Sequence, residues 1–194
     1  MTERFKAIEI PREQGKVWLT QWLTAGFDIS TAVLASRPLD WNRFLTFIPI
    51  DASVEAVKFP DAPDVPGVVS DEGLAWFLEA LMQVGAHSLI VEDDMVEKSD
   101  PKVLDEKIPS GFIGNRVVHW HELRPGSGQR AVEMIMNSAS CILNAFVSTK
   151  PIEELCLVDA QELPEGIGEK VAASLLAIVT FAFDETSFAV WDGR

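Results

Sequence analysis

The 194-residue chain contains no tyrosine, two cysteines and three histidines. Two cysteines cannot form a disulfide framework, and we expect Cys141 and Cys156 to be reduced residues packed inside a cytoplasmic protein. Apolar residues make up 47% of the chain, which is enough for a hydrophobic core and rules out an intrinsically disordered protein.

Long apolar runs are also missing. The longest uncharged segments have 16 residues at 134–149 and 13 residues at 171–183, and both are shorter than the roughly 20 residues that cross a bilayer. The first ten residues carry both signs of charge, and no apolar stretch of signal-peptide length follows them. The sequence therefore predicts neither a membrane segment nor export by a signal peptide.

Basic side chains are scarce, because 16 Lys and Arg stand against 30 Asp and Glu, for a net charge of −14. This balance argues against direct binding to nucleic acid, whose phosphates are contacted mainly by Lys and Arg, and against attachment to anionic lipid. The acidity is also concentrated. Residues 51–106 contain fourteen acidic and three basic side chains, and residues 151–194 contain nine and two.

These two acidic stretches indicate a surface for a basic partner protein. If they fold onto one face, their field attracts a cationic protein surface; a solvated face that only maintains solubility is the alternative. Trp41, in a predicted turn, is the candidate aromatic anchor of the surface. The acidic residues expected to steer the partner are Asp61, Asp64, Glu92, Asp93, Asp94, Glu97 and Asp100.

The predicted elements mix hairpins with helices and lack a regular βαβ rhythm, which favours an α+β fold. We expect one domain over 1–194, with a mixed or antiparallel sheet packed against three to four helices. Helices are expected over 11–25, 71–84, 129–148 and 167–177. Strands are expected over 44–50, 54–59, 88–92, 116–123, 155–158, 179–183 and 187–191.

Four segments need separate mention. The helix over 129–148 is expected to be buried, because it carries no charge on either side after Glu133. Residues 29–36 fit either a strand or a helix. Loops are expected at 60–69, which contains three prolines, and at 93–110.

The most distinctive local motif of the sequence is His119-Trp120-His121-Glu122. Alternate residues of a strand share a face, so His119 and His121 could approach one metal ion. A third ligand would then come from His87, Glu92, Asp93 or Asp94. The alternative is a strand whose polar residues face outward while Trp120 faces inward.

Other constellations are weaker. Glu92-Asp93-Asp94 could hold Mg²⁺. The tripeptide Asp105-Glu106-Lys107 has the Asp-x-Lys pattern of metal-dependent nucleases, but this similarity is weak. Gly126-Ser127-Gly128 opens a helix and could offer backbone N–H groups to an anion, but it lacks the ending of a phosphate-binding loop. A helix-starting turn is the simpler interpretation.

The sequence therefore favours a non-enzymatic acidic protein that blocks a basic partner in the cytoplasm. Toxin immunity proteins and phage-encoded inhibitors of nucleic-acid-binding defence systems exemplify this class. No cofactor is expected, and no particular oligomeric state is favoured. The alternatives are a small metal-dependent hydrolase that uses His119 and His121, and a structural or assembly subunit of a phage or secretion particle.

Overall fold

The computed structural model describes residues 5–9, 11–36, 44–49, 71–97, 109–114, 116–138, 142–158, 162–181 and 188–192. The helices are α1 (Arg12–Ala25), α2 (Asp28–Ser36), α3 (Asp71–Met82), α4 (Gly128–Ser138) and α5 (Ile167–Ala173). The strands are β1 (Phe5–Glu9), β2 (Phe44–Pro49), β3 (Ser88–Glu97), β4 (Ser110–Ile113), β5 (Arg116–Glu122), β6 (Ile142–Ser148), β7 (Leu175–Phe181) and β8 (Phe188–Asp192).

The described strands form one eight-stranded sheet in the order β1-β2-β8-β7-β6-β3-β5-β4. Every neighbouring pair is antiparallel. This arrangement confirms the predicted α+β class, although the described residues contain five helices rather than three to four. The strands expected over 179–183 and 187–191, which we expected to form a hairpin, correspond to β7 and β8, and these two strands pair antiparallel.

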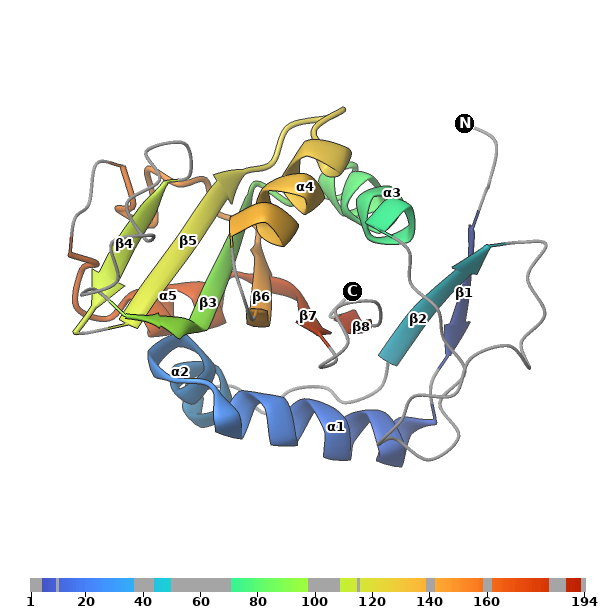
Figure 1. Ribbon diagram of the computed structural model, residues 1–194, viewed down its shortest axis with the longest axis horizontal. Coiled ribbons are helices and arrows are strands. Elements are labelled where there is room, and N and C mark those ends of the chain that lie inside the picture. Colours follow the sequence, from blue (N-terminus) through green and yellow to red (C-terminus); the bar gives the residue numbers. More distant parts are fainter. Residues whose placement is uncertain are drawn as a thin grey trace.

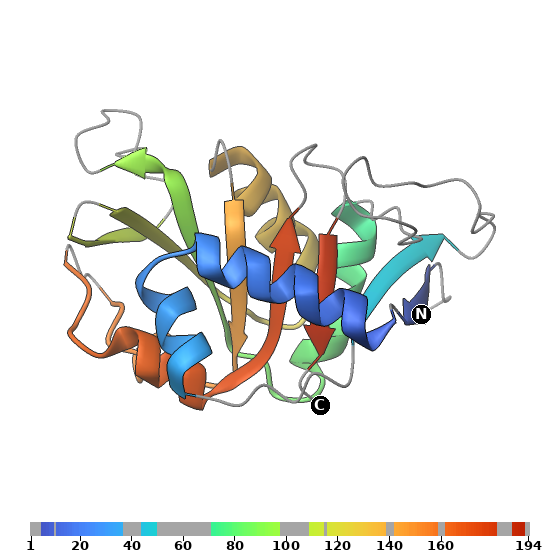
Figure 2. The same cartoon turned by 90° about the horizontal axis from the view of Figure 1, so that it is seen from below.

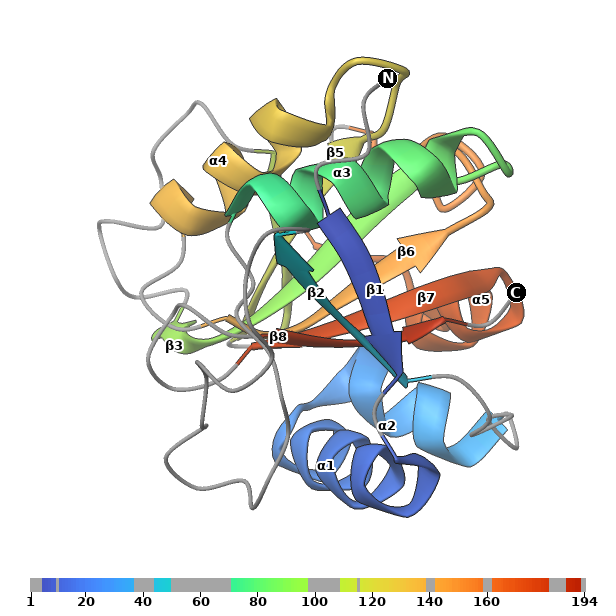
Figure 3. The same cartoon turned by 90° about the vertical axis from the view of Figure 1, so that its right-hand side faces the viewer.

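Helices cover both faces of the sheet (Figures 1 and 3). One face carries α1, α2 and α5, which pack with Ile90, Trp120, Phe146 and Ile178 into a first hydrophobic core. The other face carries α3 and α4, which pack against Leu89, Val91, Val147 and Val179 in a second core. The central strands are thus buried on both sides, so their sequences show little alternation of polar and apolar residues.

α1 and α2 follow each other with a sharp break at Gly26. α1 begins after Pro11, whose carbonyl accepts the N–H of Gly15, and a proline is well suited to the start of a helix. The N–H of Gly26 donates to the carbonyl of Trp22 and closes the last turn. The segment 29–36, which the sequence left open, is helical, and α2 runs under the sheet beside α1 (Figure 2).

The expected helix over 129–148 is wrong in its second half. α4 ends at Ser138, and β6 occupies Ile142–Ser148 between β3 and β7. The expected strand over 155–158 is also wrong, because these residues lie in turns. The helix and strand expected over 167–177 and 179–183 are present but shorter or shifted, as α5 and β7.

Other expectations concern the segments between elements. The chain was predicted to leave the sheet at residue 93, but β3 continues to Glu97. The expected strand over 54–59 and the expected loop at 60–69 lie outside the described residues. No helix in the described part of the chain is long and apolar enough to cross a membrane.

Candidate functional site

The predicted partner-binding residues fall into three groups. Glu92 is fully described and lies on β3. Asp93, Asp94 and Glu97 follow it on the same strand, and the structure describes their backbone. The remaining members lie outside the described residues; they are Asp61, Asp64, Asp100 and Trp41.

Glu92 is not at the surface, so its expected role in steering a partner is wrong. Its side chain is 0% exposed. Oε1 accepts the backbone N–H groups of Ile29 at 2.7 Å and Ser30 at 3.0 Å, and the Ser30 hydroxyl contacts Oε2. The carboxyl group therefore caps α2 from 62 residues away, where the helix dipole favours negative charge. Burial raises the pKa of Glu92, while the bonds from Ser30, Ile29 and Phe27 act in the opposite direction.

Asn144 completes this buried group. Its Nδ2 donates to the carbonyl of Trp22 and to the hydroxyl of Ser30, each at 3.1 Å, while its Oδ1 is buried without a hydrogen-bond partner. Gly26 lets α1 approach, since a Cβ at this position would lie 2.2 Å from Ser30 Oγ and 2.9 Å from Glu92 Oε2. We call Gly26, Ser30, Glu92 and Asn144 the α2 cluster.

A second carboxylate caps α4. Glu79 Oε2 accepts the N–H of Gly126 at 2.9 Å, and Oε1 accepts the N–H of Gly128 at 2.6 Å. The Gly126-Ser127-Gly128 segment is therefore the start of a helix, as the simpler interpretation held. Glu79, from α3, takes the donors that an external anion would use.

His119 and His121 share one face of β5, as expected for alternate residues. Their register partners Val91 and Leu89 face α3 and α4, whereas Glu92 contacts α2 on the opposite face. Glu92 therefore cannot join the two histidines around one ion. His87, the other histidine proposed as a ligand, is exposed.

The described residues contain no group of three His, Cys, Asp or Glu side chains placed to hold a metal ion. His119 is 4% exposed, and its Nδ1 lies 2.6 Å from the hydroxyl of Ser110 on β4. The Nε2 of His121 is buried without a hydrogen-bond partner. Burial, followed by the positive charge of Arg130, lowers the pKa of His121.

The C-terminal acidic stretch is exposed where it joins β6 to α5. We call residues 151–169 the acidic connection; it contains six acidic residues and no basic residue. The connection runs along the outer edge of β4 (Figure 1), where Leu163 N–H donates to the carbonyl of Phe112 at 2.8 Å. Its described acidic side chains, all exposed, are Glu153, Glu154, Glu162, Glu165 and Glu169.

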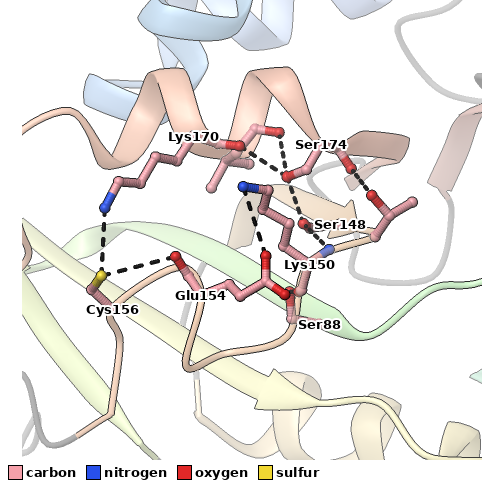
Figure 4. A network of polar contacts seen from close by, with 9 residues as sticks. Ser88, Ser148, Lys150, Glu154, Cys156, Lys170 and Ser174 are labelled. Carbon is pink, nitrogen blue, oxygen red and sulfur yellow. Dashed lines mark hydrogen bonds and ion pairs between the residues drawn. The ribbon is translucent and has the colours of Figure 1, made fainter.

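A network of polar contacts fastens both ends of the acidic connection to the fold (Figure 4). Before the start of the connection, Ser148 Oγ lies 2.7 Å from Ser174 Oγ and accepts the N–H of Lys150. The carbonyl of Lys150 in turn accepts the hydroxyl of Ser88. Ser174 Oγ also donates to the carbonyl of Lys170 on α5. These hydroxyls are buried or half-buried, so the network holds the connection to β3, β6 and α5.

Cys156 lies within the acidic connection and is exposed, which corrects its expected place in the core. Its φ angle of 62° is the one positive value among the described residues other than glycine. Lys170 Nζ lies 3.5 Å from its Sγ, as Figure 4 shows. The acidic connection therefore turns at Cys156 instead of forming the strand that was expected over 155–158.

The two acidic stretches meet at α2. Glu92, from the first stretch, caps its first turn. From the second stretch, Gly168 on α5 packs so closely that a Cβ there would lie 2.5 Å from Ala32 Cβ and 3.0 Å from the carbonyl of Asp28. The first turn of α2 thus has β3 on one side and the acidic connection on the other.

The fold and site define an antiparallel α+β protein with an anchored acidic edge and two helices capped by carboxyl groups, of which Glu92 is buried. No known protein family, curated protein or solved structure matches the chain.

Proposed function

We propose that the chain is an acidic binding protein that blocks a basic surface of a partner protein in the cytoplasm. Toxin immunity proteins and phage-encoded inhibitors of nucleic-acid-binding defence systems are proteins of this kind. The observation that carries the proposal is the acidic connection, in which the five described carboxylates are exposed and no basic residue intervenes.

The acidic connection suits electrostatic steering. Charges of one sign on an ordered surface raise the local concentration of oppositely charged partners and speed association. The polar network of Ser148 and Ser174 holds the connection before binding, so less conformational entropy is lost when a partner docks. Carboxylates on such a surface can occupy sites where a nucleic-acid-binding partner expects phosphates.

Both acidic stretches contact α2, through the buried Glu92 and through Gly168, and in this proposal the binding surface extends from the acidic connection toward the end of β3. The backbone positions of Asp93, Asp94 and Glu97 follow Glu92, which contacts the first turn of α2. Asp28, in the same turn, is exposed, and its carbonyl lies against α5. In this proposal the exposed acidic residues, without Glu92, provide the attraction.

Charge reversal on the acidic connection tests the proposal. The test variant is Glu162→Lys/Glu165→Lys/Glu169→Lys, and the control is Glu9→Lys/Glu13→Lys/Glu133→Lys, which changes exposed residues on β1, α1 and α4 by the same total charge. Each tagged protein is used for affinity capture from the native host, and the captured protein is purified for binding measurements. We expect a basic partner whose binding weakens with the test variant and persists with the control. A partner that binds both variants equally would contradict the proposal.

A further inference from the structure

We propose that Cys156 and Lys170 form a modification site, at which a peroxide joins the thiol sulfur and the amine nitrogen in a sulfenamide bond. The two residues come from different elements, because Cys156 lies in the acidic connection and Lys170 lies on α5. Lys170 Nζ lies 3.5 Å from Cys156 Sγ (Figure 4). The bond requires no partner protein, so the site goes beyond the function proposed above.

Both reacting side chains project from segments that are fixed by burial. Cys156 stands between Leu155 and Leu157, and Lys170 is followed on α5 by Val171. These three apolar residues are each 0% exposed and belong to the first hydrophobic core. The thiol and the amine are therefore held near each other by the fold, which favours a reaction between them.

The surroundings of the pair select Lys170 as the reacting amine. Cys156 is exposed, so a molecule as small as hydrogen peroxide reaches its sulfur. Lys150, the other lysine drawn in Figure 4, has its Nζ 3.8 Å from the carboxylate of Glu154. The amine that contacts the sulfur is that of Lys170.

The reaction has two steps. The thiolate of Cys156 attacks one oxygen of hydrogen peroxide, the O–O bond breaks, and the products are a sulfenic acid and water. The unprotonated amine of Lys170 then attacks Sγ, and an S–N bond forms while the S–O bond breaks. The departing hydroxide takes a proton from the nitrogen and leaves as water. The sulfur is thereby oxidised by two electrons, and the peroxide is reduced to two molecules of water.

The bond changes both the order and the charge of the acidic connection. It closes a loop from residue 156 to residue 170, which restricts the unfolded chain. It also converts the ammonium group of Lys170 into an uncharged nitrogen, so the acidic connection loses a neighbouring positive charge. Oxidation then strengthens the attraction for a basic partner, and this consequence alone rests on the proposed function.

The test treats the reduced, folded natural chain with hydrogen peroxide at mildly alkaline pH and maps the products by mass spectrometry. A protease that cleaves after glutamate separates residues 155–162, which contain Cys156, from residues 170–185, which contain Lys170. We expect these two peptides to be joined, with a combined mass lower by two hydrogen atoms, about 2 Da, and to separate after reduction with a thiol. Recovery of Cys156 only as a sulfinic or sulfonic acid, or in a disulfide with Cys141, would overturn the proposal.

Two variants and an unfolded sample serve as controls. Lys170→Arg keeps a positive charge beside the sulfur but has no amine, and it should give no joined peptides. Lys150→Arg changes the neighbouring lysine in the same way and should give them in full. In concentrated urea the yield from the natural chain should fall about tenfold or more, because unfolding separates the two groups. Joined peptides from Lys170→Arg, or an equal yield in urea, would show that the folded Cys156–Lys170 pair is not the site.

Discussion

Glu92 and Asn144 face each other across β3 and β6, and the hydroxyl of Ser30 on α2 contacts both. This contact joins residues from three elements that are far apart in the sequence. The same first turn of α2 lies against α5. The α2 cluster therefore holds the helix against which the C-terminal end of the acidic connection packs.

Ser30→Ala tests whether the α2 cluster stabilises the fold. The substitution removes a buried donor to Glu92 and an acceptor for Asn144, and we expect it to lower the free energy of unfolding by about 2 kcal/mol. Urea denaturation measures the loss. Ser127→Ala is the control, because its hydroxyl accepts one exposed bond from Arg124 N–H, and it should cost less than about 1 kcal/mol. Equal losses would show that the cluster has no special role.

Glu79→Ala tests the carboxyl cap of α4. The substitution leaves the N–H groups of Gly126 and Gly128 without their acceptor, and loss of a helix cap costs about 1 kcal/mol. Glu79→Gln retains one carbonyl oxygen and should lose less. Amide hydrogen exchange should show faster opening of α4 in Glu79→Ala, with α1 unchanged. Unchanged exchange in α4 would contradict the capping role.

The class of the fold was predictable from the sequence, but the path of β6 was not. In β6, Phe146 packs into one core while Ala145 and Val147 pack into the other. A strand buried on both faces shows no polar alternation, so its apolar run cannot be distinguished from a buried helix by periodicity. Residues 139–141, which separate α4 from β6 in the sequence, include no glycine or proline that would have indicated a change of structure.

The same burial explains the error at Glu92. Leu89, Ile90 and Val91 are consecutive buried residues, which is a sign that both faces of β3 are covered. Such a run predicts that the next side chain is buried too, even when it is charged. Its partner on α2 was beyond prediction, because nothing in the local sequence identifies a helix start 62 residues away.

The histidine pair was placed correctly on one strand face, and its environment predicts a pH effect. Burial, followed by the charge of Arg130, holds the pKa of His121 below 6.5 in the folded chain. The unfolded chain therefore binds more protons below pH 6.5, so stability present above that pH is lost as the pH falls.

His121→Gln removes this titration. We expect the natural chain to lose more stability than His121→Gln when the pH is lowered from 7 through 6.5, as measured by thermal unfolding. Arg130→Gln should reduce the loss in part, because it removes a like charge from the imidazolium. A natural chain and a His121→Gln variant with parallel pH profiles would refute the effect.

Metal content separates the binding protein from the alternative metal-dependent hydrolase. His119 Nδ1 is engaged by Ser110, and Glu92 lies on the other face of the sheet. We therefore expect the purified chain to carry the same small amount of Zn or Mn as His119→Ala/His121→Ala, by elemental analysis. Stoichiometric metal that the double substitution removes would favour the hydrolase.

Salt dependence of association tests the central claim most directly. The association rate constant of the natural chain with its purified captured partner is measured by stopped flow at increasing ionic strength. We expect the rate to fall steeply with salt. At low salt it should be about tenfold or more slower for Glu162→Lys/Glu165→Lys/Glu169→Lys than for the control triple variant. A rate that is independent of salt and equal for the two variants would contradict an acidic surface that steers a basic partner.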